Sequence, residues 1–437
     1  MEWWLILILV FFSLILLFFM GVPVAFSFIL VNILGFYFFS GGEAGISQMI
    51  LSIYNSVVKF TILPLPLFVL MGEIMFQSGV AQNMMDALDK WLGRVPGRLS
   101  LLAVGGGTLF GTLSGSSMAS AAMLASVLVP EMTKRGYKPE MSLGPILGSG
   151  GLAIMIPPTV LGVLLGAVGR ISIGDFLIAI LTPGLIMALC YAAYIVIRSL
   201  VSPHLAPSYA VTRPSLKEKL YLSLKYILPL GSIIFLVVGL IVLGVATPTE
   251  SAALGASGCF VLAMCYKGLR WEKLKTAIAH TVRITVMMLM IFAGSAGFSQ
   301  ILALTGASQG LVEAVANLPL PPHFILIGML CVVIILGTFM ESMTIIMITI
   351  PIFMPIVQAF NFDPLWFGAL ALLSIEMGLT TPPFGLILFI VKGLAPKDVT
   401  MIDVYRAGIP FLLCDLLVMI LLLSFPQLAL WLPKLIH

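Results

Sequence analysis

Charged residues are scarce in this 437-residue chain: Lys, Arg, Asp and Glu make up 9% of it, whereas 60% is hydrophobic. A soluble domain carries about 25% charged residues. Apolar runs recur along the whole sequence, with lengths near the roughly 20 residues that a helix needs to cross a bilayer. The composition therefore excludes a soluble globular protein and predicts an all-α polytopic membrane protein.

Several chemical motifs are also missing. No Gly-rich loop ends in Gly-Lys-Ser/Thr, so the sequence contains no ATP-binding P-loop. The four histidines are isolated, without a His-Glu-x-x-His pair, and the five cysteines lie in apolar segments without zinc-ligand or redox spacing. No nucleophile, base and orienting acid share one neighbourhood. We therefore expect a protein that is not an enzyme.

Two distant stretches of the sequence are nearly the same. The first reads GTLSGSS at residues 111–117 and IPPT at residues 156–159; the second reads GTFMESMT at residues 337–344 and TTPP at residues 380–383. The Gly-Thr pairs are 226 residues apart (337 minus 111), and the Pro-Pro pairs are 225 apart (382 minus 157). Duplicated apolar segments interrupted by Gly, Ser, Thr and Pro are typical of secondary transporters.

The apolar segments predict five full spans in each half, about ten in total, plus one unusual segment per half at residues 100–132 and 324–357. Each unusual segment has two apolar arms of about 15 residues, which is marginal for crossing roughly 30 Å at 1.5 Å per residue. This length favours a re-entrant helical hairpin, with two short spans and a polar loop as the alternative. The predicted domains are two repeats and a cytoplasmic connector: 1–200, 226–437 and 201–225.

Loop charges predict how the hairpins are oriented. Basic stretches at residues 89–98 and 134–138 flank the first hairpin, so both flanks are expected in the cytoplasm. Residues 317–323 and 358–364 flank the second hairpin without any Lys or Arg, so both are expected outside. The hairpins then enter from opposite faces, which is an inverted topology. Arg170 is an exception, because it lies on a turn otherwise expected outside.

A hairpin tip at membrane depth leaves backbone groups unpaired, at several kcal/mol per group unless something satisfies them. Sodium suits exposed carbonyl and hydroxyl oxygens, whereas helix N-termini suit an anion. The double prolines must break their helices because they donate no backbone hydrogen bond. Small-residue clusters also serve helix packing, but their recurrence in both halves favours a paired ion site. The predicted sodium ligands are Ser114, Gly115, Ser116, Gly150, Ile156, Pro157, Thr159, Glu341, Ser342, Gly378, Thr380 and Thr381.

Acidic residues at membrane depth are further functional candidates. Glu341 lies at the second tip, and Glu376 lies four residues before Thr380 on one helix face. These acids are expected to bind a cation, to hold the tip closed or to pair with a base such as Arg283, and we favour pairing or tip closure. Asp415 has no counterpart in the first half, so we interpret it as structural or as part of a subunit contact.

At these motifs the sequence resembles the large membrane subunit of tripartite ATP-independent periplasmic transporters, the DctM-like permeases. The resemblance rests on GVP at 21–23, LPLPLF at 63–68, residues 111–120, IPP at 156–158 and TTPP at 380–383. It implies a scaffold domain and a mobile transport domain that carries both hairpins. It also implies elevator-type, sodium-coupled uptake of an organic acid anion across the bacterial inner membrane.

The resemblance further implies two partners. One is a small four-span, DctQ-like membrane subunit, expected as a separate chain because this sequence begins directly with the permease; the other is a DctP-like periplasmic binding protein. An organic acid anion fits the N-termini of the half-helices. The predicted substrate-binding residues are Ser116, Ser117, Met343, Thr344 and Thr381. The alternatives are a stand-alone cation-coupled carboxylate carrier and a non-transporting scaffold.

Overall fold

The computed structural model describes residues 2–93, 95–207, 215–266 and 268–436, except for the side chains of Ala81, Leu113 and Ser114. Every regular element within these ranges is a helix. Helices pair their own backbone groups, so they suit a chain of this composition inside lipid. Seven of them have the length and hydropathy of a membrane span, and α1, α2 and α19 are shorter apolar helices. The prediction of an all-α polytopic membrane protein is confirmed.

The helices of the first half follow one another with short connections. In chain order they are α1 (Trp3–Phe19), α2 (Val24–Phe39), α3 (Glu43–Val57), α4 (Pro64–Ser78), α5 (Val80–Leu92), α6 (Arg98–Ser114), α7 (Ser117–Lys134), α8 (Pro139–Ser142), α9 (Gly144–Met155), α10 (Val160–Gly169) and α11 (Ile173–Val201).

The second half repeats much of this order after the connector, of which residues 208–214 lie outside the described ranges. Its helices are α12 (Leu216–Leu222), α13 (Leu228–Val242), α14 (Pro248–Cys265), α15 (Trp271–Leu304), α16 (Ala307–Ala316), α17 (Pro322–Phe339), α18 (Ser342–Ala359), α19 (Pro364–Thr380), α20 (Leu386–Leu394), α21 (Met401–Ser424) and α22 (Gln427–Ile436). A π-helical turn, Ser223–Ile227, joins α12 to α13.

Matching turns in the two halves have matching backbone conformations. Gly79 separates α4 from α5 with φ 73°, and Gly306 separates α15 from α16 with φ 70°. Glycine is the residue that adopts this left-handed conformation without a steric penalty. The sequence repeat therefore corresponds to a repeat of local structure.

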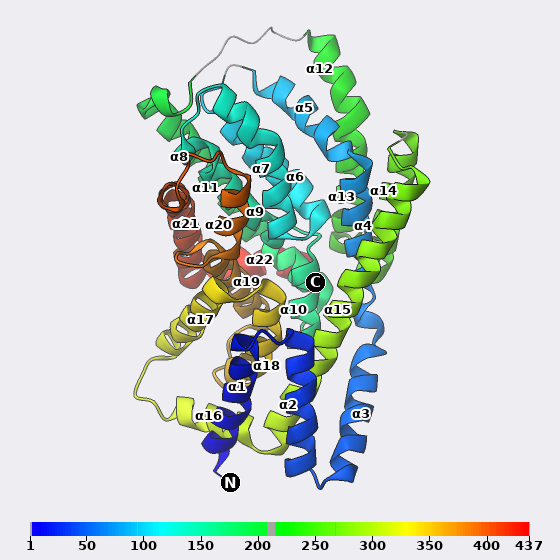
Figure 1. Cartoon of the computed structure of the whole chain (residues 1–437), viewed down its shortest axis with the longest axis vertical. Coiled ribbons are helices and arrows are strands. Elements are labelled where there is room, and N and C mark those ends of the chain that lie inside the picture. Colours follow the sequence, from blue (N-terminus) through cyan, green and yellow to red (C-terminus); the bar gives the residue numbers. More distant parts are fainter. Residues whose placement is uncertain (1, 94, 208–214, 267, 437) are drawn as a thin grey trace.

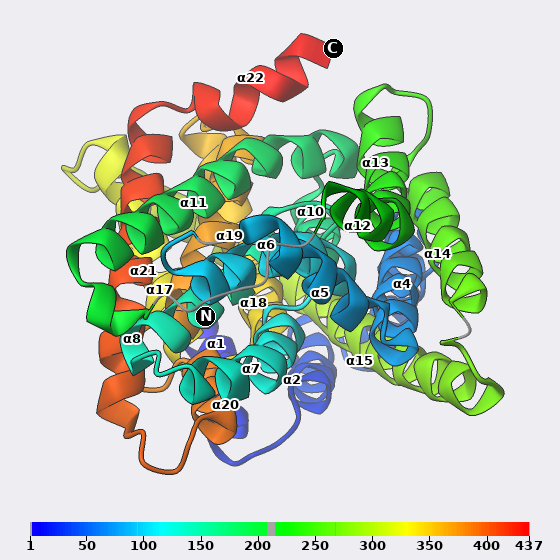
Figure 2. The same cartoon turned by 90° about the horizontal axis from the view of Figure 1, so that it is seen from above.

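The helices form two groups. In the scaffold group, α4 packs against α14 and α15, α2 against α15, and α13 against α14. In the hairpin group, α6 and α7 pack against α9, and α17 packs against α19. The view in Figure 2 shows α4, α13, α14 and α15 along one side of the molecule, with α11, α17 and α21 on the other. The division of the chain into a scaffold domain and a mobile transport domain stays a prediction of the family resemblance.

The two hairpins approach the centre from opposite ends of the molecule. Figure 1 shows α6 and α7 in the upper part, below α5 and α12, whereas α17 and α18 lie in the lower part near α16 and the N-terminus. Each hairpin reaches the broken helix of its own half. This arrangement is the one that two inverted repeats require.

Close backbone contacts hold each first hairpin arm against its broken helix. A Cβ added to Gly337 on α17 would lie 2.7 Å from Cα of Gly378 on α19. At the matching place in the first half, a Cβ on Gly111 would lie 2.9 Å from Cα of Ala153 on α9. Side chains at these positions would push the helices apart, so the small residues are required by packing.

The first prediction concerns this packing. Gly337→Ala should destabilise the protein by about 1–3 kcal/mol, because the added methyl group meets backbone atoms that cannot move aside. Gly328→Ala on the same helix is the matched control, since nothing lies within 4 Å of its added Cβ. Thermal unfolding of both variants in detergent should show a lower midpoint for Gly337→Ala alone. Equal unfolding midpoints of the two variants would contradict the close approach of Gly337 to Gly378.

Candidate functional site

The tip of the first hairpin joins α6 to α7. The α6 helix ends at Ser114, whose side chain is outside the described part, and Gly115 follows with φ 60°. Ser116 caps α7, and its hydroxyl oxygen accepts a hydrogen bond from the backbone N–H of Ala119 at 3.4 Å. A Cβ on Gly115 would lie 2.7 Å from Cγ2 of Val160, so the turn and the contact with α10 both require glycine.

The break in the first helix faces this tip. The α9 and α10 helices are bent by 46° relative to each other across the break. Pro157 and Pro158, joined by a cis peptide bond, donate no N–H, so carbonyl groups of the preceding turn lack helical donors. Thr159 is fully buried, and its hydroxyl has no hydrogen-bond partner among the described residues. The break thus leaves oxygen atoms available at the tip.

The tip of the second hairpin is capped by an acid. The Glu341 carboxylate accepts a hydrogen bond from the backbone N–H of Met343 at 3.2 Å. Ser342 and Thr344 are buried in the first turn of α18. The α18 end is thus capped by a carboxyl group, whereas the α7 end is capped by the neutral hydroxyl of Ser116.

The second broken helix resembles the first. The α19 helix ends at Thr380, and the cis-linked Pro382-Pro383 pair separates it from α20. The Thr380 hydroxyl donates to the carbonyl of Glu376 at 3.1 Å, and the Thr381 hydroxyl donates to the carbonyl of Met377 at 2.5 Å. A hydroxyl that donates its proton keeps two oxygen lone pairs, so both threonines can still bind a cation.

One cavity of about 530 Å³ connects the two tips. The hairpin group contributes Gly115, Ser116, Met118, Ala119, Val160, Glu341, Met343 and Thr344, and the scaffold group contributes residues of α2, α4 and α15. Ligand pockets typically enclose about 300–1,000 Å³. The cavity therefore has room for a small molecule between the scaffold group and both half-helix N-termini.

The structure brings together only some of the predicted site residues. Those at the cavity are Gly115, Ser116, Glu341, Met343 and Thr344. Those at the breaks and in the hairpin contacts, away from its lining, are Ser117, Gly150, Ile156, Pro157, Thr159, Ser342, Gly378, Thr380 and Thr381. The cavity residues thus suit a substrate, whereas most of the others surround the broken backbone.

Glu376 links the two halves of the protein. Its side chain is 1% exposed, and one carboxylate oxygen accepts a hydrogen bond from the Ser117 hydroxyl at 3.1 Å. Its other oxygen has no hydrogen-bond partner among the described residues. A Cβ on Gly151 of α9 would lie 2.5 Å from Cγ of Glu376, so the acid fills the space beside the first broken helix.

The expected pairing of the acids with Arg283 is not found. Within the described ranges, neither Glu341 nor Glu376 forms an ion pair with this arginine, because Glu341 caps its own helix and Glu376 bonds to Ser117. Asp415 is buried and accepts a hydrogen bond from the Tyr191 hydroxyl. That burial supports its structural role and excludes a subunit contact through its carboxylate.

Sequence reasoning missed the scaffold wall of the cavity. Glu73 on α4 and His280 on α15 both line it, with 3.5 Å between the histidine Nδ1 and a carboxylate oxygen. Glu73 was recognisable as an intramembrane acid, but His280 looked isolated because its partner is 207 residues away (280 minus 73). The pair becomes visible only when α4 and α15 lie side by side.

An all-helical membrane protein whose two halves each direct a broken hairpin at one cavity belongs to the class of secondary transporters built from repeats. Two solved transporters share the fold at low sequence identity. The chain resembles the Alcanivorax borkumensis YdaH transporter with a TM-score of 0.68, at 14% identity over 89% of this chain and 90% of that one. It resembles Neisseria gonorrhoeae MtrF with a TM-score of 0.62, at 17% identity over 88% and 84%.

The family described as "Tripartite ATP-independent periplasmic transporter, DctM component" matches residues 11–428, and the chain belongs to this family. It is 32% identical to the C4-dicarboxylate TRAP transporter large permease protein DctM of Pseudomonas aeruginosa, over 89% of this chain and 90% of the relative. It is 28% identical to the ectoine large permease TeaC of Halomonas elongata, over 95% and 96%. The sialic acid large permease SiaM of Vibrio cholerae is also 28% identical, over 96% of each chain.

These matches confirm the predicted family. They also confirm that the chain is a multi-pass permease of the bacterial inner membrane and not an enzyme.

A second prediction tests the buried link between the halves. Glu376→Ala should cost about 2–5 kcal/mol of stability, because it leaves a cavity beside Gly151 and removes the acceptor for Ser117. Glu376→Gln keeps the size and one acceptor oxygen, so it should stay much closer to the native protein. The control is Glu131→Ala on α7, an exposed acid paired with Arg135, which should change stability by less than about 1 kcal/mol. Similar unfolding midpoints for both alanine variants would contradict the buried link.

Proposed function

We propose that this chain carries an organic acid anion across the inner membrane together with sodium ions, in an elevator-type movement of the hairpin group. The observation that carries the proposal is the cavity between both hairpin tips and the scaffold group. A site at a boundary between two helix groups can open to either side when one group moves relative to the other.

The substrate anion is assigned to the α7 side of the cavity. The N-terminus of α7 offers backbone N–H groups beside the neutral Ser116 hydroxyl, and its dipole favours negative charge. The opposite end at α18 is capped by Glu341, which occupies the N–H of Met343. Met343 and Thr344 then contact the remainder of the substrate from the second tip. Ser117 acts indirectly, through its bond to Glu376.

Sodium is assigned to the two breaks. The first break offers the Thr159 hydroxyl, which has no partner in the described part of the chain, and the carbonyl groups freed by Pro157 and Pro158. The second offers the hydroxyl oxygens of Thr380 and Thr381. Hard oxygen ligands of this kind suit a hard cation and not a thiol-seeking metal. The residues present therefore fit sodium, which supplies positive charge beside the anion when bound.

The energetics favour more than one cation. One elementary charge moving through 100 mV is worth about 2.3 kcal/mol. Two sodium ions with one monovalent anion would move a net charge of +1 inward, so the membrane potential would add to the sodium gradient. Two breaks, one in each half, provide for two ions.

The relatives support an organic acid as cargo and a tripartite assembly. Their printed names give C4-dicarboxylate, ectoine and sialic acid, so the family accommodates different cargo in one fold. The isethionate TRAP permease protein DctMQ of Oleidesulfovibrio alaskensis is longer, with this chain covering 55% of it. We propose a separate small membrane subunit and a periplasmic binding protein as partners here.

The third prediction is that uptake requires sodium. Proteoliposomes that contain the permease with its small subunit, supplied with the binding protein and its ligand, should take up that ligand under a sodium gradient. Replacing sodium with potassium or choline should abolish uptake, and unchanged uptake would contradict coupling. Omitting the binding protein separates this proposal from a stand-alone carrier, which would still transport.

A fourth prediction places one sodium ion at Thr159. Thr159→Val keeps the shape but removes the hydroxyl, so the sodium concentration for half-maximal uptake should rise about fivefold, or about 1 kcal/mol. The protein should not lose stability, because this buried hydroxyl has no hydrogen-bond partner among the described residues. Thr108→Val on α6 is the control, since its hydroxyl donates to the carbonyl of Val104 in its own helix. If both variants had the same sodium dependence, Thr159 would not be a sodium ligand.

A further inference from the structure

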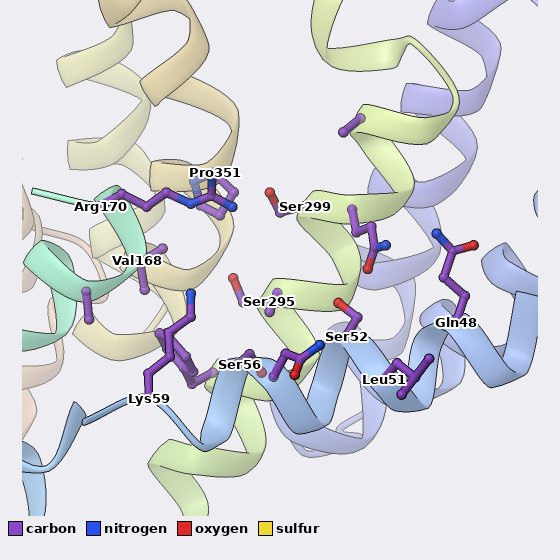
Figure 3. A pocket seen from close by; sticks show the side chains of 16 residues that line it. Gln48, Leu51, Ser52, Ser56, Lys59, Val168, Arg170, Ser295, Ser299 and Pro351 are labelled. Atoms are coloured by element: carbon purple, nitrogen blue, oxygen red, sulfur yellow. The ribbon is translucent and has the colours of Figure 1, made fainter. Parts of the chain in front are cut away.

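A second cavity, of about 520 Å³, lies between the two helix groups and shares no lining residue with the cavity at the hairpin tips. The α3 helix, which packs against α2 and α15 of the scaffold group, lines it together with α15, and α10 and α18 line it from the hairpin group. Figure 3 shows the side chains of Lys59 and Arg170 extending into this space, with the hydroxyls of Ser295 and Ser299 on the α15 side. We call it the outer cavity.

The lining of the outer cavity is positively charged. Lys59 and Arg170 both line it, and it contains no Asp or Glu. Neither cation forms an ion pair within the part of the chain that the structure describes. Asp175 lines an adjoining cavity together with both cations. A cavity lined by two cations and by no carboxylate favours an anionic ligand.

Lys59 and Arg170 also lie on a side of the protein whose connecting segments otherwise lack positive charge. Gln48 of α3 lines the outer cavity, and residues 39–48, which run from the end of α2 into α3, contain no Lys or Arg. Residues 243–250, 317–323 and 358–364 have none either. The lack of Lys and Arg assigns all four segments to the outer face, because positive residues accumulate in the cytoplasm. Basic residues that oppose this rule are candidates for a function.

The backbone conformation of Arg170 is further evidence that its side chain has a function. Arg170 follows α10 with φ 54°, a left-handed conformation that glycine adopts most easily and that disfavours other L-residues. The preceding residue, Gly169, could have been followed by a second glycine without this cost. An arginine kept in such a conformation indicates that its guanidinium group is needed at this place.

We propose that the outer cavity is an anion-binding vestibule in which Lys59 and Arg170 hold the carboxylate group of the substrate before it reaches the hairpin tips. The arginine presents a planar fork that matches a carboxylate, and the lysine adds a point charge. Lys59 follows α3 of the scaffold group and Arg170 follows α10 of the hairpin group, so the bound anion contacts both. The identity of the natural anion rests on the proposed function, whereas the charge selectivity of the cavity does not.

The first experiment measures this selectivity without the substrate. Ser299→Cys is introduced into the full chain after serine has replaced the five native cysteines, Cys190, Cys259, Cys265, Cys331 and Cys414. The new thiol is reacted with a sulfonatoethyl thiosulfonate, which is anionic, and with a trimethylammonioethyl thiosulfonate, which is cationic. Adding Lys59→Gln and Arg170→Gln should lower the anionic-to-cationic rate ratio at least about fivefold.

The matched control removes the same charge from another part of α15. Lys273→Gln with Lys275→Gln lies at the start of the helix that carries Ser299 and should leave the rate ratio unchanged. An equal ratio with and without Lys59 and Arg170 would overturn the proposal. A thiol that reacts with neither reagent would overturn it too, because a vestibule must be accessible.

The second experiment measures uptake in the proteoliposomes described above. Lys59→Gln with Arg170→Gln should raise the apparent KM for substrate about threefold to tenfold, with the maximal rate and the sodium dependence unchanged. Arg170→Lys should give an apparent KM between those of the native protein and the double variant, because it keeps the charge but loses the planar fork. Added choline chloride should slow native uptake at limiting substrate by screening the cations, and should slow the double variant less.

Different outcomes separate the two proposals. A native protein without sodium-dependent uptake would contradict the proposed function, whereas the labelling result would stand. If the double variant loses affinity for the binding protein itself, measured by surface plasmon resonance, the cations dock that protein and the vestibule is wrong. An unchanged KM would also overturn it.

Discussion

The structure depends on one constraint: backbone groups inside a membrane must find partners, and this chain interrupts four helical segments where lipid cannot supply any. Each hairpin tip therefore lies against the broken helix of its own half. Gly115 meets Val160 in the first half, and Gly337 meets Gly378 in the second. Close contact leaves no room for lipid between tip and break. In the proposed mechanism the breaks are the places where a cation replaces the missing donors.

The two halves are also joined by a buried contact. Glu376 of α19, the broken helix of the second half, bonds to Ser117 at the first tip, and its side chain lies against Gly151. A displacement of the first tip is therefore transmitted to the broken helix of the second half. In the proposed mechanism, this contact and the cavity bordered by both tips place the ion and substrate sites in one structural unit, which coupling between them requires.

Much of the architecture could be predicted from the sequence because it depends on short motifs of neighbouring residues. The double prolines, the Gly/Ser tips and the short apolar arms located both hairpins and both breaks, and the loop charges oriented them. Contacts between distant segments were not predictable in the same way. The Ser117 hydroxyl and Glu376 are 259 residues apart, and no periodicity connects them. Lys59 and Arg170 likewise share a cavity only because the ends of α3 and α10 border the same space between the helix groups.

The central claim is that the two hairpins enter the membrane from opposite faces, and accessibility labelling tests it most directly. Single cysteines at Lys134, which ends α7, and at Asn317, which precedes α17, are placed in the cysteine-free chain. A membrane-impermeant maleimide is then added to spheroplasts. The account predicts that the cysteine at position 317 reacts at once and the cysteine at position 134 reacts only after permeabilisation. Reaction of both from the same side would contradict it.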